Sequence, residues 1–522
     1  MNSPQSHAEE IQIFSEQIVE VKEKAQAEIE YLDTSYLADI KRTLSLARDD
    51  EAIGSKMTAA VQRKHELEEI LQVPFFTELI SVNPLTHTTK PIRIGKFSLT
   101  EGNVYSWVAP IGALRFEDPG IKTYEVHSGD KRTITVDSKY DLLIRNNELV
   151  FLSKTFADHH KEVLLQKEIE EHKKAFLLKD IVDRMEGYQD KIIRLPYFGK
   201  MTITGPAGSG KTTLALHRIA YLKLIPLYEK IFHHKQSLVV VKDVSSKEYF
   251  KELLPSLGIN RAKIETYDEL IKEVLDLSQK KSYSRAELTT LACEHTTKKQ
   301  GFVKTKTVNT IKMGKPSRST STNKIQFDII LVDEFQNYSL DELSLFDYLV
   351  DQTTQAIMYI GDIHQTIHEN GVGIAGRFKE LHSEARHIHV GVSYRNTKEI
   401  IQYIEQRGHS TQGASPKRSG KKVDEMQTDS PEILIKKINE FITSKTENIH
   451  GVIVSSNIIE TIKNSCNETE FCKILSYQDS QGFEFESTLV VISHTIPHTE
   501  IERNLEYIAL TRAMNEMQII QL

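Results

Sequence analysis

The amino-acid sequence predicts an α/β fold, and two features of the pattern lead to this prediction. A glycine-rich phosphate loop at 205–212 lies between a strand-like run and a helical run. A second run typical of a buried strand, 327–332, ends in two acidic residues, and carboxyl ends of parallel strands are where nucleotide sites form. Before these segments, the chain shows a long helical pattern and then a β-rich texture. We therefore expect two smaller N-terminal parts followed by a larger nucleotide-binding part.

Length and composition exclude several classes of protein. The chain has 522 residues, which at about 150 residues per domain suggests three or four structural units. Its composition, 39% hydrophobic and 27% charged, is that of a globular protein, and no apolar run approaches the roughly 20 residues of a membrane-spanning helix. The start of the sequence has no secretory signal pattern. The chain has three cysteines, Cys293, Cys466 and Cys472, which are too few for a disulfide framework and fit a reducing cytosol. We therefore predict a cytoplasmic protein, and the missing apolar run predicts that it has no membrane partner.

Charge is distributed unevenly along the chain. The formal net charge of −7 lacks the strong basic excess of many nucleic-acid-binding proteins, although it is compatible with a local basic groove. Residues 298–324 contain eight Lys or Arg and no Asp or Glu. We interpret this segment as a loop that could also touch an anionic partner, so nucleic acid stays open as a partner.

Residues 1–73 are predicted to form an N-terminal arm. Apolar residues recur in steps of three and four along two stretches, 11–40 and 57–71, which is the pattern of an antiparallel helical hairpin or short coiled coil. From spacing alone, a scaffold with a solvated turn is favoured over a tip that meets a cation or a basic surface. The turn carries three acidic residues: Asp49, Asp50 and Glu51.

Residues 74–155 are predicted to form a small β-rich domain. Short β-favouring runs alternate with turn signals such as Asn83-Pro84, which is typical of an antiparallel sheet or barrel. A long polar helix is then expected from Ala157 to Arg194. The expected strands lie near 92–94, 104–108, 133–136 and 149–152.

The phosphate loop is the strongest chemical signal. Gly205-Pro206-Ala207-Gly208-Ser209-Gly210-Lys211-Thr212 fits G-x-x-x-x-G-K-[ST] in full, and a helical run begins at Thr213. The glycines let the backbone curl so that its N–H groups point at phosphates, assisted by the helix N-terminus. We predict that the loop and Thr213 bind ATP, that Lys211 reaches the β- and γ-phosphates, and that Thr212 holds Mg²⁺.

The acidic pair after the second buried run supplies the expected metal partner. Asp333 would orient Mg²⁺ through water, and Glu334 would position or activate the attacking water. Reading both acids as an ordinary surface strand end would leave the phosphate loop without its metal ligand.

The segment Asp333-Glu334-Phe335-Gln336 resembles UvrD/Rep-type superfamily-one helicase ATPases, and further segments that resemble that family follow in the expected order. The resemblance implies two RecA-like P-loop lobes, residues 156–385 with a linker helix and residues 386–522, with ATP in the cleft between them. It also implies one role for each of six residues: Gln189 reads adenine, Gln365 senses the γ-phosphate, Tyr394 stacks on adenine, Arg395 contacts phosphate, Glu484 holds the ribose and Arg512 is the arginine finger.

Outside these segments the sequence is similar to HelD-type ATPases, which release and recycle stalled RNA polymerase. The similarity includes Trp107-Val108-Ala109-Pro110, the stretches 73–76, 92–97, 215–222 and 249–258, and the N-terminal hairpin itself. This resemblance implies RNA polymerase as a partner.

Three departures from these families change the interpretation. Only about 65 residues separate Gly258 from Ile325, where HelD-type proteins carry a large insertion, and 407–470 is too short for a helicase accessory domain. The run 239–244 lacks the aromatic residue that stacks on a base in strand-translocating helicases, and such stacking contributes roughly 1–3 kcal/mol per base. ATP hydrolysis is therefore better supported than unwinding. We predict a HelD-like ATPase that remodels RNA polymerase complexes; the alternative is a single-strand DNA or RNA translocase or helicase working with a nuclease.

Overall fold

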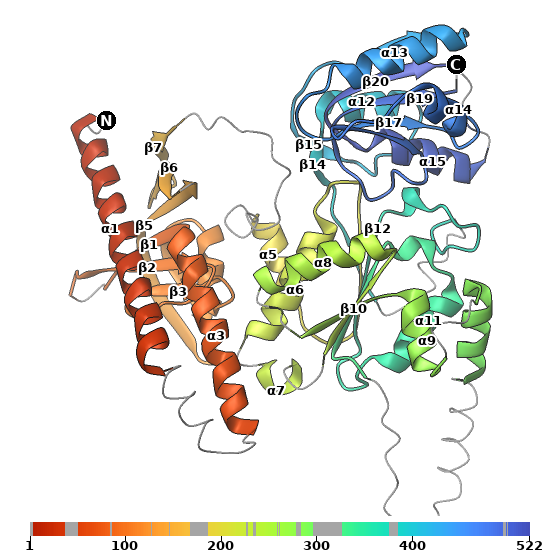
Figure 1. The fold of residues 1–522 in the computed structure, drawn as a ribbon. Coiled ribbons are helices and arrows are strands. Elements are labelled where there is room, and N and C mark those ends of the chain that lie inside the picture. Colours follow the sequence, from red (N-terminus) through yellow and green to blue (C-terminus); the bar gives the residue numbers. More distant parts are fainter. Residues whose placement is uncertain are drawn as a thin grey trace, which may run out of the picture. The chain divides into compact units, whose positions relative to one another are not determined.

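The computed structural model has a mixed α/β fold. It describes residues 4–36, 51–83, 86–126, 128–145, 147–167, 186–225, 228–232, 236–257, 259, 261–277, 283–295, 326–374, 385–493, 497 and 499–522. The chain divides into two compact units, Met1–Arg194 with Leu224–Glu229, and Leu195–Lys223 with Lys230–Leu522. Figure 1 shows the elements of both. Among the helices in the described ranges, none is long and apolar enough to cross a lipid bilayer.

Two long helices of the first unit pack against each other and against a sheet (Figure 1). Helix α1 spans Pro4–Tyr31 and continues as the π-helical turn η1, Leu32–Tyr36, while α3 spans Glu51–Gln72. Arg63 of α3 forms an ion pair with Glu28 of α1, at 2.7 Å between Nε and Oε1. The buried side chains of α1 recur in steps of three and four, as its amphipathic pattern requires: Phe14, Ile18, Val21, Ala25 and Ile29.

The sheet of the first unit has the strand order β3-β2-β1-β5-β6-β7, with β4 paired to β5. All its pairs are antiparallel except β2 with β3. Across β1 and β2, Glu78 and Arg93 form a buried ion pair of 2.8 Å. The strands are β1 (Thr77–Val82), β2 (Thr89–Gly95), β3 (Val104–Ser106), β4 (Gly120–Glu125), β5 (Lys131–Arg145), β6 (Glu148–Phe156) and β7 (Lys161–Gln166), with a 3₁₀ helix η2 at Pro110–Phe116.

The predicted polar helix from Ala157 to Arg194 is wrong in its first part. Residues Lys161–Gln166 form β7, which pairs antiparallel with β6. In β7 Leu164 is buried and Leu165 packs partly against the core, whereas Lys161 and Gln166 at its ends are exposed, and pairing to the edge of the sheet determines the conformation. The end of the predicted helix is present as α5, Gly187–Ile193.

Residues 168–185 of the predicted polar helix lie outside the described residues, and two further predictions do so as well. The basic segment 298–324 is one, and the acidic turn is the other, because Asp49 and Asp50 lie there and only the backbone of Glu51 is described, as the start of α3.

The first sheet of the second unit is fully parallel, in the order β10-β9-β11-β12-β8-β13. Its carboxyl ends therefore meet at one edge, and that edge carries the loops that follow β8, β11 and β12. The strands are β8 (Lys200–Thr204), β9 (Ser237–Val241), β10 (Ala262–Thr266), β11 (Ile329–Asp333), β12 (Ala356–Gly361) and β13 (Arg386–His389). The helices are α6 (Lys211–Leu224), α7 (Glu229–Phe232), α8 (Val244–Ser256), α9 (Tyr267–Val274), a helix over 285–295, and α11 (Leu340–Leu349), with 3₁₀ turns η5 (Phe335–Asn337) and η6 (Ile363–Gln365).

A second parallel sheet follows, in the order β16-β20-β19-β17-β18, together with the separate pair β14-β15. Alternate residues of its central strands enter different cores: Val452 packs with α13 and α14, whereas Ile453 packs with α12 and α15. The strands are β14 (Val392–Thr397), β15 (Ser415–Arg418), β16 (Asp424–Gln427), β17 (His450–Val454), β18 (Cys472–Ser476), β19 (Phe485–Ile492) and β20 (Ala513–Gln521). The helices are α12 (Lys398–Gln406), α13 (Pro431–Thr443), α14 (Ile459–Ser465) and α15 (Glu500–Leu510).

Candidate active site

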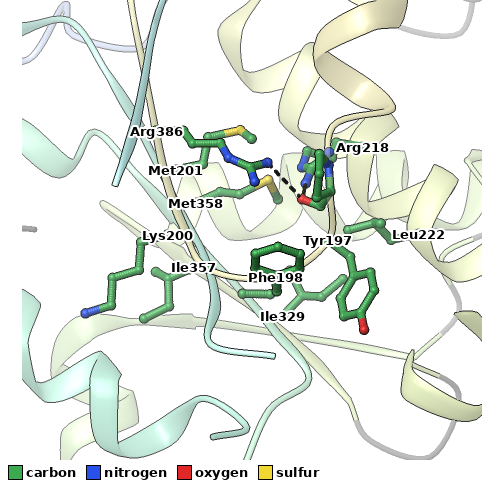
Figure 2. A pocket seen from close by; sticks show the side chains of 13 residues that line it. Tyr197, Phe198, Lys200, Met201, Arg218, Leu222, Ile329, Ile357, Met358 and Arg386 are labelled. Carbon is green, nitrogen blue, oxygen red and sulfur yellow. Dashed lines mark hydrogen bonds between the residues drawn. The ribbon is translucent and has the colours of Figure 1, made fainter. Parts of the chain in front are cut away.

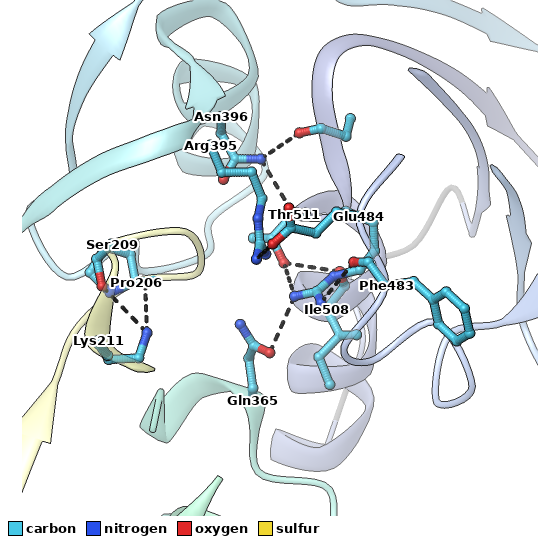
Figure 3. A network of polar contacts seen from close by, with 12 residues as sticks. Pro206, Ser209, Lys211, Gln365, Arg395, Asn396, Phe483, Glu484, Ile508 and Thr511 are labelled. Carbon is cyan, nitrogen blue, oxygen red and sulfur yellow. Dashed lines mark hydrogen bonds and ion pairs between the residues drawn. The ribbon is translucent and has the colours of Figure 1, made fainter. Parts of the chain in front are cut away.

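The loop between β8 and α6 places the predicted phosphate-binding residues at the carboxyl edge of the first sheet. Lys211 opens α6, and its Nζ donates hydrogen bonds to the loop's own carbonyl oxygens, Gly205 O at 2.9 Å and Pro206 O at 2.8 Å. Figure 3 shows the contact with Pro206. Desolvation lowers the pKa of this amine, although the nearby Asp362 and Glu334 oppose the shift. The ammonium thus lies inside the curve of the loop, where a phosphate would compete for it.

Strand β14 runs against this loop. The backbone N–H of Tyr394 donates to Gly208 O at 3.0 Å. Gly208 has a φ of +70°, and a Cβ placed there would lie 2.2 Å from the Cβ of Arg395. Only glycine tolerates both the left-handed backbone and this close approach. The glycine therefore brings two predicted nucleotide contacts, Tyr394 and Arg395, next to the phosphate loop.

The two predicted acids lie at the end of β11, separated from β8 in the sheet only by β12. Burial, and then the charge of Glu334, raise the pKa of Asp333. Glu334 itself has a left-handed backbone with φ +51°, and its Oε2 accepts a hydrogen bond from Gln336 Nε2 at 2.5 Å. A left-handed conformation is unusual for a residue other than glycine and is typical of functional sites.

Gln365 and Arg512, predicted to sense and neutralise the γ-phosphate, contact each other directly. Arg512 Nη2 donates to Gln365 Oε1 at 3.2 Å, and its Nε donates to Ile508 O at 2.9 Å (Figure 3). The guanidinium is 2% exposed, and burial, followed by repulsion from Arg395, lowers its pKa to about 10. This hydrogen bond joins the edge of the first sheet, through η6, to the end of α15 beside the second sheet.

Arg395 and Glu484, predicted to contact phosphate and ribose, form an ion pair with each other (Figure 3). Arg395 Nε is buried and has no hydrogen-bond partner. A buried guanidinium N–H without a partner is costly, so an anionic ligand would gain a ready donor here.

The structure adds residues to the site that the motif analysis did not single out. Asp362 directly follows β12, and it is 1% exposed with a hydrogen bond from Tyr507 Oη at 3.2 Å. Asn396 is fully buried, and its Nδ2 donates to Thr511 O at 3.2 Å and Ala513 O at 2.7 Å, on either side of Arg512. An acid at the end of a buried strand was the signal for Asp333, and the same signal marks Asp362.

A second series of hydrogen bonds leads to Gln365 from the end of β9, the strand next to β11 in the first sheet. Lys242, after β9, donates from Nζ to Gln481 Oε1 at 2.8 Å, and Gln481 Nε2 donates to Gln365 O at 3.3 Å. Burial lowers the pKa of Lys242. The segment around Gln481 and Glu484 therefore contacts two parts of the site. Gln481 is hydrogen-bonded to the part built on the first parallel sheet, and Glu484 is ion-paired with Arg395 in the part that follows β13.

Gln189, predicted to read adenine, belongs to the first compact unit, whereas the phosphate loop belongs to the second. It is the third residue of α5, and its Oε1 accepts a hydrogen bond from Glu186 N at 2.9 Å in a capping box. Its role toward adenine remains a prediction.

The residues at this edge fit a divalent cation of the Mg²⁺ type in the chemistry of their donors. Mg²⁺ prefers oxygen ligands and keeps several waters. Asp333 offers a carboxylate whose pKa is raised by burial and by the charge of Glu334, against the opposing charge of Lys211, and Thr212 offers a hydroxyl in the first turn of α6. When bound, the cation would neutralise charge on the β- and γ-phosphates.

A shallow pocket lies at the other end of the first sheet (Figure 2). It is lined by residues that begin β8, β12 and β13, Lys200, Ala356 and Arg386, and by Arg218. Both arginines donate to Pro196 O, at 2.7 Å from Arg218 and 3.3 Å from Arg386. Because it opens at the amino ends of the strands, this pocket is separate from the phosphate-loop edge.

A family model of a helicase core matches the second half of the chain. Residues 269–521 match the family model described as viral superfamily 1 RNA helicase core domain. The match contains Asp333, Glu334, Gln365, Arg395, Glu484 and Arg512, and it begins after the phosphate loop.

Solved helicase structures show low overall similarity. The arterivirus nonstructural protein 10 helicase has 12% identity and a TM-score of 0.34, covering 78% of this chain and 73% of its own. The structure of the arterivirus helicase in complex with DNA likewise has 12% identity and a TM-score of 0.34, covering 77% of this chain and 74% of its own. The C-terminal domain of a possible DNA helicase from Lactobacillus plantarum WCFS1 has 17% identity and a TM-score of 0.21, covering 25% of this chain and 88% of its own. Among curated proteins, no match is found.

Proposed function

We propose that this chain is an ATP-hydrolysing motor of the superfamily 1 helicase type that uses Mg²⁺. The observation that carries the proposal is the 3.2 Å hydrogen bond between Gln365 and Arg512, which joins the two parallel-sheet halves at the edge where the phosphate loop lies. The family match over 269–521 supports the same assignment. The two halves would correspond to two RecA-like lobes.

In the proposed reaction, Lys211 and the loop N–H groups bind the phosphates, and Thr212 and Asp333 hold Mg²⁺. Glu334 accepts a proton from the attacking water while the oxygen of that water bonds to the γ-phosphorus. The bond between the γ-phosphorus and the leaving oxygen of ADP breaks, and ADP departs. Arg512 and Arg395 stabilise the charge on the transferring group, each with guanidinium N–H groups besides those that now bond Gln365 and Glu484. Because both arginines belong to the part of the chain after β13, hydrolysis would depend on how the two halves are held together. Tyr394 and Glu484 would bind the nucleoside.

The test is steady-state ATP turnover by the purified full-length chain, with Lys211→Ala as the inactive partner. We expect turnover that requires Mg²⁺ and is lost in Lys211→Ala, because that ammonium is the main positive charge inside the loop. As a matched control, Lys473→Ala on β18 removes a lysine outside this loop. Absence of turnover in the unmodified chain, or equal turnover in Lys211→Ala, would refute the assignment.

The finer proposal is that the motor remodels RNA polymerase complexes in the manner of HelD-type ATPases. Its support is the sequence similarity around Trp107 and in the N-terminal helices. The match to an RNA helicase core favours a second candidate, a single-strand DNA or RNA translocase.

Two measurements separate these candidates. A polymerase remodeller should release nucleic acid from stalled RNA polymerase in an ATP-dependent way while single strands stimulate its ATPase little. A translocase should show robust stimulation by single-stranded DNA or RNA that weakens with added salt, since phosphate contacts are screened by salt.

A further inference from the structure

Asp362 is the most densely bonded carboxylate at the edge of the first sheet. It receives hydrogen bonds from His364 N at 3.0 Å and Gln365 Nε2 at 3.2 Å within its own turn. It also receives them from Tyr507 Oη at 3.2 Å and from Gln412 Nε2, both of which belong to the half of the unit that follows β13. Since it is 1% exposed, protein donors rather than water satisfy its oxygens.

The carboxylate determines which way the Gln365 amide faces. A carboxylate only accepts hydrogen bonds and a guanidinium only donates them, whereas a carboxamide has one end of each kind. Gln365 lies between Asp362 and Arg512, with its Nε2 toward the former and its Oε1 toward the latter. The reversed amide would place its oxygen against a carboxylate and its N–H₂ against a guanidinium, so the two charged neighbours exclude it.

We propose that Asp362 is a positioning residue that sets the orientation of the Gln365 carboxamide and, through Tyr507, the place of the α15 end that carries Arg512. This inference rests on the proposed function, because Gln365 matters for turnover only if the site hydrolyses ATP. Asp362 would not touch the nucleotide. It fixes the two groups that do.

The contacts of α15 extend the argument to Arg512. Tyr507 lies near the end of this helix and is 2% exposed, and Arg512 Nε donates to Ile508 O one residue further on. On the preceding turn, Asn504 Nδ2 donates to Thr366 O at 2.9 Å. The last turns of α15 are therefore held against the segment Asp362–Thr366 by two hydrogen bonds besides the bond from Arg512.

The experiment is a double-mutant cycle on ATP turnover by the full-length chain. Asp362→Asn keeps the shape of the side chain but can both donate and accept, so the amide of Gln365 loses its fixed direction. We expect kcat to fall by at least about tenfold while KM for ATP stays within about twofold. In a Gln365→Ala background, Asp362→Asn should lower kcat by a clearly smaller factor, because the amide that it positions is gone and only its effect through Tyr507 remains.

A swap variant tests the same idea if Asp362→Asn folds poorly. In Gln365→Glu a carboxylate faces Asp362, which should slow turnover, and adding Asp362→Asn restores one donor and one acceptor with their places exchanged. We expect the double variant to turn over ATP faster than Gln365→Glu alone. Asp424→Asn, an exposed Asp to Asn change on β16, is the matched control and should leave kcat unchanged.

The outcomes distinguish this inference from the proposed function. If the unmodified chain hydrolyses ATP and Gln365→Ala slows it, but Asp362→Asn slows both backgrounds by the same factor, Asp362 is merely structural. A swap variant no faster than Gln365→Glu leads to the same conclusion. If the unmodified chain shows no turnover at all, the proposed function itself fails.

Discussion

Arg407 and Glu506 form a buried ion pair, in which Arg407 Nε lies 2.9 Å from Glu506 Oε1. The pair joins the end of α12 to α15, the helix that leads to Arg512, and His409 Nε2 lies 2.9 Å from the same Oε1. Burial alone would raise the pKa of Glu506, but hydrogen bonds and charge from His409 and Arg407 outweigh it and hold the pKa below 4.5.

A pH-dependent loss of stability should therefore follow from Glu506→Gln. A carboxylate with a depressed pKa in the folded state contributes stability above the unfolded pKa and loses it as the pH falls through the folded pKa. We expect Glu506→Gln to lower the thermal midpoint at pH 7, since breaking a buried pair costs about 3 kcal/mol. The difference from the unmodified chain should shrink below pH 4.5. Glu470→Gln, at an exposed glutamate, should show neither effect; a pH-independent difference for Glu506→Gln would contradict this account.

Replacement of the proposed base, Glu334→Gln, should separate binding from turnover. The amide keeps the size of the side chain but cannot take the proton of the attacking water, and such losses typically slow catalysis by about 10²–10⁴-fold. We expect ATP binding, followed with a fluorescent analogue, to stay within about threefold while turnover collapses and bound ATP accumulates. Undiminished turnover in Glu334→Gln would remove its assigned role.

The close approach at the phosphate loop predicts different costs for two glycines. Both Gly208 and Gly210 have a positive φ, so an alanine at either position carries backbone strain of about 1 kcal/mol. Only at Gly208 does the new Cβ also meet Arg395, whereas nothing lies within 4 Å at Gly210. We expect Gly208→Ala to lower the thermal midpoint more than Gly210→Ala. Equal midpoints would mean that β14 does not hold Arg395 against the loop.

Asn396→Ala should disturb Arg512 without touching it. The substitution removes two hydrogen bonds to Thr511 O and Ala513 O, and leaves both carbonyls buried, at a cost of about 1–3 kcal/mol. Because these carbonyls flank Arg512, we expect a lower thermal midpoint together with slower ATP turnover. Asn467→Ala, at an exposed asparagine, is the control. A fall in stability with normal turnover would show that the turn around Arg512 does not depend on Asn396.

The spacing of residues along the sequence predicts those functional residues that lie within one loop or at the end of one strand. The phosphate loop and Asp333 were predicted because a glycine pattern, or an acid after an apolar run, is visible within ten residues. The pairing of Gln365 with Arg512 joins residues 147 positions apart, and only the family resemblance suggested their roles.

The contacts that were missed depend on the packing of distant segments. Tyr507 reaches Asp362 from 145 residues away, and although an acid after a buried strand marks Asp362, no local pattern marks Tyr507 as its partner. Strand β7 does not form the predicted helix, because its six residues are too few to indicate a period and pairing with the neighbouring strand β6 determines its conformation. Tertiary context overrides a weak local preference in such cases.

The hydrogen bond from Tyr394 N to Gly208 O has a kinetic consequence. Together with the bonds from Lys211 to its own loop, it occupies hydrogen-bonding groups of the phosphate loop, so we expect these contacts to open as phosphates enter. Nucleotide loading then becomes a two-step process, in which the observed association rate levels off at high ATP concentration at the rate of opening. We expect the same opening to accompany the release of ADP, so that this one backbone contact at the phosphate loop would influence the rate of the whole cycle.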